Sequence, residues 1–282
     1  MPHDSVAPTL TNASEIDAAA VTMRPLTTPE EYQACVALQQ DIWGEAFAET
    51  VPASLLQVTA HVGGIAVGAF APDLRLVGFV FGIAGVMDGE LVHWSHMLGV
   101  TEHAREMGIG RRLKLYQRSE LAKRGIAKMY WTFDPLQARN AHLNLNRLGV
   151  RVVDYKVNMY GVTASPLHYG LATDRLVVES LTSGDDGVHA NAGAAANGAP
   201  VLTPFPKPGD RRVDEPDAPI ALIEIPTDFQ ELVGGSPEAA LEWRVAARTH
   251  FQWAFRHGYA VTGFRRDQIT HRSFYVIARS HE

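Results

Sequence analysis

The stretch LGVTEHAREMGIGRRLKL, residues 98–115, contains a strand pattern that ends at Val100 and a glycine-spaced turn that leads directly into a helix. Gly108 and Gly110 have no side chains, so backbone N–H groups can approach an anion closely, while the helix N-terminus adds partial positive charge. Between residues 105 and 118, Glu106 alone is acidic, and the cations are Arg105, Arg111, Arg112, Lys114 and Arg118. We therefore expect a ligand with several phosphates here; the alternative is a plain connection followed by a solvated basic helix face.

The spacing of the glycines separates this turn from two common nucleotide motifs. The chain has no G-x-x-x-x-G-K-[ST], and Leu113 stands where a dinucleotide fingerprint has its third glycine. Residues 105–110 instead read R-x-x-G-x-G, which resembles the acetyl-CoA pyrophosphate signature of the GNAT superfamily of N-acyltransferases. The segments TFDPLQARNAHLNLNRLGV (132–150) and ATDRL (172–176) are similar to a GNAT branch linked with N-acylamino acid metabolism.

The resemblance covers about residues 22–182 and implies an α/β (α+β) fold, a mixed and mostly antiparallel sheet flanked by helices. Hydrophobic periodicity and turn residues predict elements in the same order, including a capping box at Thr28–Glu31 that opens the first helix. The expected helices lie at about 28–43, 53–58, 109–124 and 139–148. The expected strands lie at 21–26, 65–71, 74–85, 91–100, 127–133, 151–161 and 174–180.

The rest of the chain is predicted to form smaller units around this GNAT domain, which we place at 21–182. Residues 1–20 are a polar, alanine-rich N-terminal extension, and residues 183–218 are a Gly/Ala/Pro-rich connector. Residues 219–282 predict a β-α-β-β appendage, with Ser236 as the helix cap. Because about 60 residues is marginal for an independent core, we expect the appendage to pack on the first domain.

Composition narrows the functional class. With 46% hydrophobic residues and a formal charge of −6, the chain predicts a soluble enzyme and no nucleic-acid partner. Cys35 is its one cysteine, which fits the cytoplasm and is expected to be a buried small hydrophobe. No apolar run predicts a signal peptide or a membrane span, and no His, Cys or acidic spacing predicts a metal site.

The GNAT resemblance implies where an acyl-CoA would bind. The backbone of the strand would pair with the pantetheine arm, and N–H groups of the turn would hold the pyrophosphate. A backbone N–H near Leu98 or Gly99 would stabilise the oxyanion. The implied cofactor-binding residues are Met97, Leu98, Gly99, Val100, Arg105, Met107, Gly108, Ile109, Gly110, Arg111 and Asn140.

The same resemblance points to His96 as the general base. GNAT enzymes with a base on this strand commonly have it four or six residues before the closing hydrophobic residue, here Val100. His96 fits that position, whereas His93 is predicted to face the other side of the strand. A satisfied structural histidine is the alternative.

The general acid of the family is missing, because Leu145 stands where many GNAT enzymes have a tyrosine. A thiol with a pKa near 8.5 leaves largely unassisted, so activity remains expected. Tyr155 and Tyr160 are candidate substitutes, and structural roles stay open for both.

Three further residues are candidates for the acceptor side. Asp134 either orients an ammonium group or initiates a turn before Pro135. Arg139 and Arg175 are candidates to pair with a substrate carboxylate, with solvated ion pairs as the alternative.

Together these features predict direct transfer of an acetyl or succinyl group from acyl-CoA to a small primary amine, such as an amino acid. The rival interpretation is a catalytically weak GNAT-like module that binds CoA as a sensor or scaffold. A homodimer is compatible with both.

Overall fold

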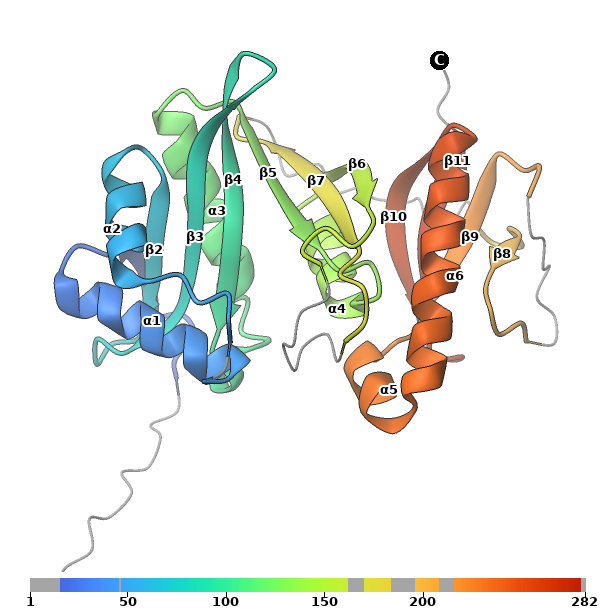
Figure 1. Ribbon diagram of the computed structural model, residues 1–282, viewed down its shortest axis with the longest axis horizontal. Coiled ribbons are helices and arrows are strands. Elements are labelled where there is room, and N and C mark those ends of the chain that lie inside the picture. Colours follow the sequence, from blue (N-terminus) through green and yellow to red (C-terminus); the bar gives the residue numbers. More distant parts are fainter. Residues whose placement is uncertain (1–15, 46, 162–169, 184–195, 208–215, 280–282) are drawn as a thin grey trace, which may run out of the picture.

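The computed structural model describes residues 16–45, 47–161, 170–183, 196–207 and 216–279, which form two sheets (Figure 1). Residues 1–15 of the expected N-terminal extension and residues 184–195 and 208–215 of the expected connector lie outside the described ranges. The first sheet has seven strands and the second has four.

The first sheet confirms the element order expected of a GNAT fold. Its strands lie in the order β1-β2-β3-β4-β5-β7-β6. Among these strands, only β4 and β5 pair in parallel, and all other neighbours are antiparallel. The strands are β1 (Thr22–Pro25), β2 (Ile65–Phe70), β3 (Leu76–Met87), β4 (Glu90–Val100), β5 (Lys128–Phe133), β6 (Arg151–Lys156) and β7 (Arg175–Leu181). The helical elements are α1 (Pro29–Trp43), α2 (Ala53–His61), η1 (Glu102–Ala104), α3 (Ile109–Lys123), α4 (Ala138–Ala141) and η2 (His142–Arg147).

Helices cover both faces of this sheet (Figure 1). The helix α1 begins at the predicted capping box, in which Thr28 Oγ1 accepts from Glu31 N and the Glu31 carboxylate accepts from Thr28 N. α1 and α2 pack on the face that carries Phe79, Phe81 and Met97. α3 packs on the opposite face, in the same hydrophobic core as Val80.

Two predicted elements are shorter or less regular than expected. The helix predicted at 139–148 is an α-helical turn, α4, continued by the π-helical segment η2. The strand predicted at 151–161 ends at Lys156, because Asn158 takes a left-handed conformation with φ 48°. That conformation lets the Asn158 backbone N–H donate to Asp174 Oδ1, which turns the chain away from the sheet.

The second sheet contains the predicted β-α-β-β appendage with two additions. The strand order is β10-β11-β9-β8, and α6 runs along one face of the sheet (Figure 1). One addition is the helix α5; the other is β8, which forms inside the predicted connector and pairs in parallel with β9. The elements are β8 (Val201–Leu202), β9 (Ile220–Ile225), α5 (Phe229–Gly235), α6 (Pro237–Arg256), β10 (Tyr259–Asp267) and β11 (Arg272–Arg279).

The two sheets share buried contacts. Arg244 on α6 binds the Asp134 carboxylate with both terminal nitrogens, and the Tyr275 hydroxyl donates to Pro135 O at 2.7 Å. Asn146 Nδ2 donates to Phe264 O at 2.8 Å. Apolar side chains of both parts belong to one hydrophobic cluster, so the C-terminal segment packs directly on the part of the chain that forms the first sheet.

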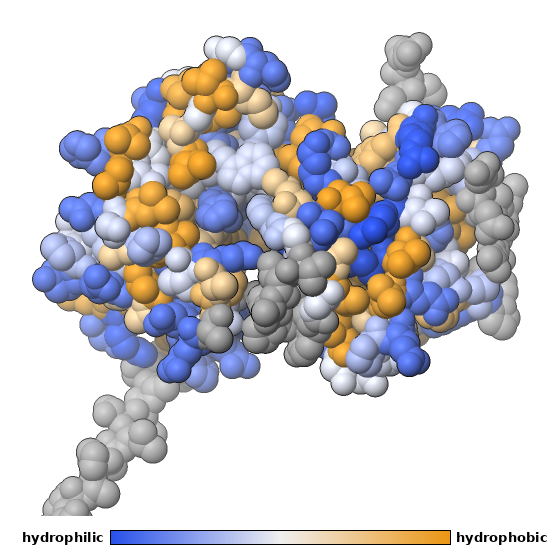
Figure 2. Space-filling model, in the orientation of Figure 1, coloured by the Kyte–Doolittle hydropathy of each residue, from blue (hydrophilic) through white to orange (hydrophobic). Residues whose placement is uncertain are grey.

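The surface carries apolar side chains at the tip of the β3–β4 hairpin, where Val86 and Leu91 are exposed (Figure 2). The expected homodimer stays a prediction. None of the helices in the described ranges is long and apolar enough to span a bilayer.

Candidate functional site

The sheet opens between β4 and β5. The two strands pair over three rungs, Val92 with Lys128, His93 with Met129 and Trp94 with Tyr130. Beyond the last rung β4 pairs with β3 alone and β5 with β7 alone, and the ribbons diverge (Figure 1). The facing strand edges can therefore accept an extended ligand as an added strand.

A β-bulge in β4 lies beside this opening. Phe81 pairs with Met97 and the next residue, Gly82, pairs with Ser95, so His96 is the extra residue of the bulge. The His96 ring packs edge-on against Phe81 at 6.2 Å, on the face covered by α1 and α2. Bulges commonly re-aim side chains next to active sites.

The two histidines of β4 lie on opposite faces, as their spacing predicts. His93 is fully buried on the α3 face, where its Nε2 lies 2.9 Å from Gln117 Nε2. Desolvation lowers the pKa of His93 to about 3, with Lys114 and Arg124 adding to the effect, so the ring is neutral near pH 7. His96 is exposed, and desolvation against its neighbours lowers its pKa while Glu49 acts in the opposite direction. A neutral imidazole at His96 can accept a proton at neutral pH.

The glycine turn has the geometry of an anion site. Gly108 takes φ 75° and precedes α3 without any side-chain cap, and the first turn of α3 contains no acidic residue. A helix start leaves its first N–H groups without helical partners, and no side chain caps them here. A Cβ at Gly108 would meet no atom within 4 Å, so the space beside the turn is open to a ligand.

Four of the five cations predicted around the turn can be followed through their contacts. Arg105 and Arg111 stay beside it, with their Nε atoms 3.4 Å from Val100 O and 3.0 Å from Arg147 O. Arg112 instead donates to Ala18 O and Val21 O at 2.6 Å each, which fixes the segment before β1. The expectation for Lys114 was wrong, since its side chain is buried beneath the sheet.

Lys114 belongs to a buried polar network between α3 and the two diverging strands. Its Nζ donates to Ser95 Oγ at 2.7 Å and lies 4.0 Å from the centre of the Trp131 ring. Burial lowers the pKa of Lys114 well below its usual value. The attraction of an ammonium to an indole face is about 2 kcal/mol when desolvated, which is less than the several kcal/mol that burying an unpaired ion costs.

For Asp134 the structure supports the turn interpretation and not the acceptor site, because its Oδ1 and its carbonyl oxygen accept from the Leu136 and Gln137 N–H groups. Its carboxylate is buried and receives Arg244 Nη1 at 2.9 Å, Arg244 Nη2 at 2.6 Å and the Leu136 N–H at 2.9 Å. Burial raises the pKa of Asp134, but Arg244 and Arg175 outweigh it and hold the pKa below its ordinary value. Both oxygens are thus committed, and the residue joins the two sheets instead of facing an acceptor ammonium.

Tyr160 lies near the edge of the opening. Its hydroxyl is 3.2 Å from Thr132 Oγ1, and Thr132 lies on β5 beyond the last rung shared with β4. The Arg175 guanidinium lies 5.3 Å from the Tyr160 ring centre and 3.8 Å from the Asp134 carboxylate. Tyr155, the other candidate acid, is buried and donates to Asp174 Oδ2, and burial raises its pKa far above the ordinary range.

The structure also places three other residues that the sequence analysis singled out. Arg139 is exposed and lies 3.2 Å from Glu106, beside the glycine turn, which is the solvated ion pair given as its alternative. Asn140, predicted to bind the cofactor, is exposed within α4. Leu145 is 1% exposed and sits in the core.

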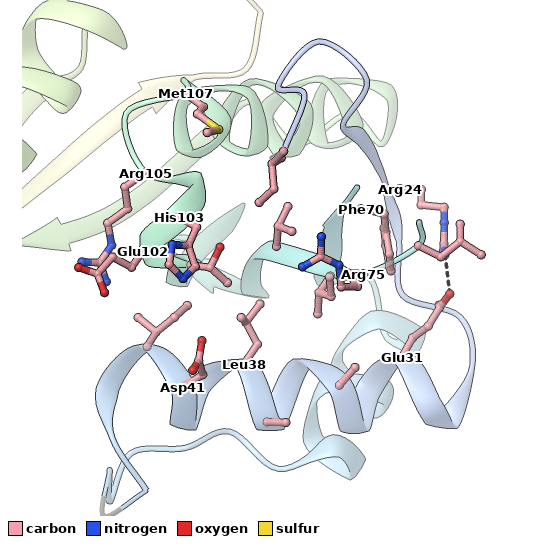
Figure 3. A pocket seen from close by; sticks show the side chains of 18 of the residues that line it. Arg24, Glu31, Leu38, Asp41, Phe70, Arg75, Glu102, His103, Arg105 and Met107 are labelled. Carbon is pink, nitrogen blue, oxygen red and sulfur yellow. Dashed lines mark ion pairs between the residues drawn. The ribbon is translucent and has the colours of Figure 1, made fainter. Parts of the chain in front are cut away.

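A groove of about 1460 Å³ lies between α1 and the β4–α3 connection (Figure 3). Arg105, His103 and Met107 form one side of it, and Leu38 and Asp41 of α1 form the other. An ion pair between Arg24 and Glu31 closes one end at 2.6 Å. A ligand on the glycine turn would therefore border this groove.

Two further expectations concern sulfur and metal chemistry. Cys35 is buried as expected, and desolvation raises the pKa of its thiol to about 12, which disfavours a reactive thiolate. Within the described ranges, no three His, Cys, Asp or Glu side chains gather in a way that would hold a metal ion.

Sequence reasoning missed Ser95, Gln117 and Arg244. Gln117 had a usable signal, because it shares an i, i+4 row with the buried residues Ile109, Leu113 and Leu121. Ser95 lies two residues from His93 and so shares its buried face. Arg244 had no local signal, since its partner Asp134 is 110 residues away.

Comparison with known proteins gives a likeness in structure alone. No family model matches the chain, and no curated protein sequence is similar to it. Solved structures that resemble it include an aminoglycoside 6'-acetyltransferase type Ii, 22% identical with a TM-score of 0.46 over 58% of this chain and 98% of that one. The ribosomal-protein-S18-alanine N-acetyltransferase from Escherichia coli is 18% identical, with a TM-score of 0.44 over 58% and 97%.

A third example is Arabidopsis thaliana Naa50 in complex with the bisubstrate analogue CoA-Ac-MVNAL. It is 17% identical, with a TM-score of 0.46 over 57% of this chain and 98% of that one. Because these TM-scores lie below 0.5, the fold assignment rests on the strand order and pairing of the chain itself.

Proposed function

We propose that this chain, which has the GNAT fold, transfers an acyl group from acyl-CoA to a primary amine by direct attack of the amine. The observation that carries the proposal is the opening between β4 and β5, which lies at the same end of the sheet as the uncapped glycine turn. CoA has an extended pantetheine arm with a pyrophosphate at one end. The arm matches the open strand edges, and the pyrophosphate matches the glycine turn.

The proposed ligand contacts follow from the backbone. The pantetheine arm lies against Met97–Val100, whose β5 side has no strand partner, and the pyrophosphate lies on N–H groups of Met107–Gly110. Arg105 and Arg111 supply positive charge at the turn, and Arg139 and Asn140 border it from α4. A backbone N–H near Leu98 or Gly99 stabilises the oxyanion.

His96 is the proposed general base. An amine attacks a thioester only when unprotonated, yet an amine with a lysine-like pKa near 10.4 is almost entirely ammonium at pH 7. Burial of one side of the ring lowers the pKa of His96, so it is neutral there and accepts the proton directly or through a water. The Tyr160 hydroxyl, beside Thr132, is the proposed donor to the departing thiolate.

The acceptor is proposed to be a small primary amine of the amino-acid kind, and the acyl group acetyl or succinyl. Arg175, which lies near Tyr160 at the acceptor end, is the candidate for binding a carboxylate. Its side chain is 12% exposed, so a carboxylate that reaches it is largely desolvated and paired strongly.

The rival function is a CoA-binding sensor or scaffold with little turnover. Leu145 favours this rival, because it is buried and cannot donate a proton at the position where a tyrosine is common.

Thiol release separates the two functions. The full chain is incubated with acetyl-CoA or succinyl-CoA and free amino acids of both hands, with carboxylate-free amines as controls. Steady thiol release that depends on the amine supports the transferase. CoA binding without turnover across a broad amine panel supports the sensor, and absence of CoA binding contradicts both.

A further inference from the structure

Lys114 lies where β4 and β5 separate. Its Nζ is 2.7 Å from Ser95 Oγ on β4 and 4.0 Å from the centre of the Trp131 ring on β5. Ser95 and Trp131 are the residues that directly follow the last shared rung, Trp94 with Tyr130. One nitrogen therefore reaches both strands at the closed end of the opening.

The hydrogen bonds around Lys114 run in one direction. Nζ donates to Ser95 Oγ, and Ser95 Oγ donates to Gln117 Oε1 at 2.8 Å. With its oxygen engaged, the Gln117 amide donates through Nε2 to His93 Nε2, which places the His93 proton on Nδ1. The serine hydroxyl proton is committed to Gln117, so Ser95 orients Lys114 without taking the lone pair of a neutral amine.

The surroundings of Lys114 disfavour a charged ammonium. Within the described ranges no carboxylate lies at ion-pair distance from its Nζ, and its neighbours are Ser95, Gln117, His93 and Trp131. Burial lowers the pKa of Lys114 well below the ordinary value, and Lys114 in turn lowers that of His93. At any given pH, more of this lysine is neutral than of an exposed one.

We propose that Lys114 is a self-acylation site, at which its amine takes the acyl group of an acyl-CoA bound between β4 and β5. In this step the Nζ lone pair attacks the thioester carbonyl carbon, a C–N bond forms and the C–S bond breaks. The thiolate leaves and takes the proton that the nitrogen loses, which gives Nε-acyl-Lys114 and free CoA. This inference rests on the proposed function, because it requires acyl-CoA in the opening. For this step the thioester lies beside Ser95, deeper in the opening than the position near Leu98 or Gly99 proposed for transfer to a free amine.

Nε-acyl-Lys114 would fill part of the opening between β4 and β5. An acyl amide at Lys114 keeps an N–H that can donate to Ser95 Oγ, so the buried network persists. The acyl group itself would occupy the closed end of the opening, between Ser95 and Trp131. Self-acylated protein is therefore expected to turn over more slowly than unmodified protein.

The test maps acetylated lysines by peptide mass after the full chain is incubated with acetyl-CoA, without an amine, at pH 7, 8 and 9. Lys123 is the internal control, since it is exposed on the same helix and paired with Glu120. An exposed lysine should react roughly tenfold faster for each pH unit, because about one part in 10³ is neutral near pH 7. Lys114 should react at least about tenfold faster than Lys123 at pH 7 and depend less on pH.

Variants separate directed acylation from solution chemistry. Lys114→Arg should remove the adduct at that position, whereas Lys123→Arg should leave it. Gly108→Asp, which weakens proposed CoA binding, should slow acylation of Lys114 and leave Lys123 unchanged. Ser95→Ala keeps the amine but loses its orienting partner, so it should also slow acylation of Lys114 if circular dichroism shows an intact fold.

Calorimetry with CoA distinguishes failure of this inference from failure of the proposed function. If acetyl-CoA binds but Lys114 stays unmodified while Lys123 reacts, self-acylation is overturned and the proposed transferase stands. An equal rate at Lys114 in wild type and Gly108→Asp overturns it as well. If acetyl-CoA does not bind at all, both proposals fall together.

Discussion

At the scale of single residues, His96 owes its position to the bulge in β4 and its state to partial burial against Phe81. His96→Ala should lower kcat/KM by roughly 10² to 10⁴-fold, the usual contribution of a general base, and leave CoA affinity nearly unchanged. The wild type should lose activity at acid pH, and the midpoint of this loss should lie below the ordinary histidine pKa of about 6.5, because desolvation lowers the pKa of His96.

Steady-state kinetics from pH 5 to 8 check this prediction. His61→Ala is the matched control, since His61 is an exposed histidine on α2 away from the opening. A His96→Ala protein with wild-type kcat/KM and an unchanged acid limb would remove His96 from the mechanism.

Protonation of His93 should make the free energy of unfolding depend on pH. Its pKa is about 3 in the folded protein and about 6.5 in the unfolded chain. Between these values the unfolded chain binds a proton that the folded protein does not, so stability falls as pH falls. For this group the loss between pH 7 and 5 is about 2 kcal/mol.

Urea unfolding at pH 7 and pH 5 tests this effect. His93→Gln can still accept from Gln117 but does not titrate, so its free energy of unfolding should fall by about 2 kcal/mol less than that of the wild type. Identical pH dependence in the two proteins would show that His93 is not held neutral.

At single residues, the sequence correctly predicted which face of a strand a side chain occupies. The spacing of His93 and His96 predicts opposite faces, and the glycine turn was located by its motif. The exposure of Lys114 could not be inferred in the same way, because neighbouring arginines suggest a solvated face. Its burial depends on Ser95 and Trp131, which lie on two other elements.

At the scale of elements, the bulge depends on Gly82. A Cβ at Gly82 would lie 2.3 Å from His93 Nε2 and 2.6 Å from Trp94 O, and the latter is backbone that cannot yield easily. Gly82→Ala should therefore destabilise the protein by about 2 kcal/mol, as overpacking does. Because the strain falls on the bulge, kcat/KM should fall as well.

Gly85→Ala is the matched control for Gly82→Ala. It lies on the same strand, and a Cβ there would meet nothing within 4 Å, so its effect should stay within about 0.5 kcal/mol. Equal urea midpoints for the two variants would contradict the close packing assigned to the bulge.

The order of elements followed from hydrophobic period and caps, whereas their irregularities did not. A bulge adds one residue without a compositional mark, so pairing was needed to locate it at His96. The π-helical segment η2 also has no turn residue that announces it. The strand β8 was missed because its two residues lie inside a Gly/Ala/Pro-rich stretch and are stabilised by β9.

At the scale of the whole molecule, the pair of Arg244 and Asp134 joins the appendage to the end of β5. The two side chains are 2% and 10% exposed and form two hydrogen bonds. Arg244→Ala removes both guanidinium hydrogen bonds and leaves the buried carboxylate with the Leu136 N–H and with Arg175 at 3.8 Å, so it should destabilise the protein by about 3–5 kcal/mol. Arg279→Ala, which breaks the exposed pair with Asp217, should cost far less, because water screens an exposed ion pair.

Urea unfolding with two probes, near-UV and far-UV circular dichroism, tests both variants. A single shared transition is expected for the wild type, because the two sheets share a buried core. If Arg244→Ala is as stable as Arg279→Ala, the junction between the sheets does not depend on this pair. Sequence reasoning predicted packing of the appendage from its small size, but the partners lie too far apart in the chain for a local pattern to pair them.

The most direct test of the central claim measures CoA binding by calorimetry in two glycine variants of one helix. Gly108 and Gly125 flank opposite ends of α3, both have positive φ, and a Cβ at either would meet no atom within 4 Å. Substitution therefore strains the backbone alike at both sites, while Gly108→Asp alone puts a carboxylate at the proposed pyrophosphate site. We expect CoA binding to be lost in Gly108→Asp and kept in Gly125→Asp; equal CoA affinity in the two folded variants would contradict the account.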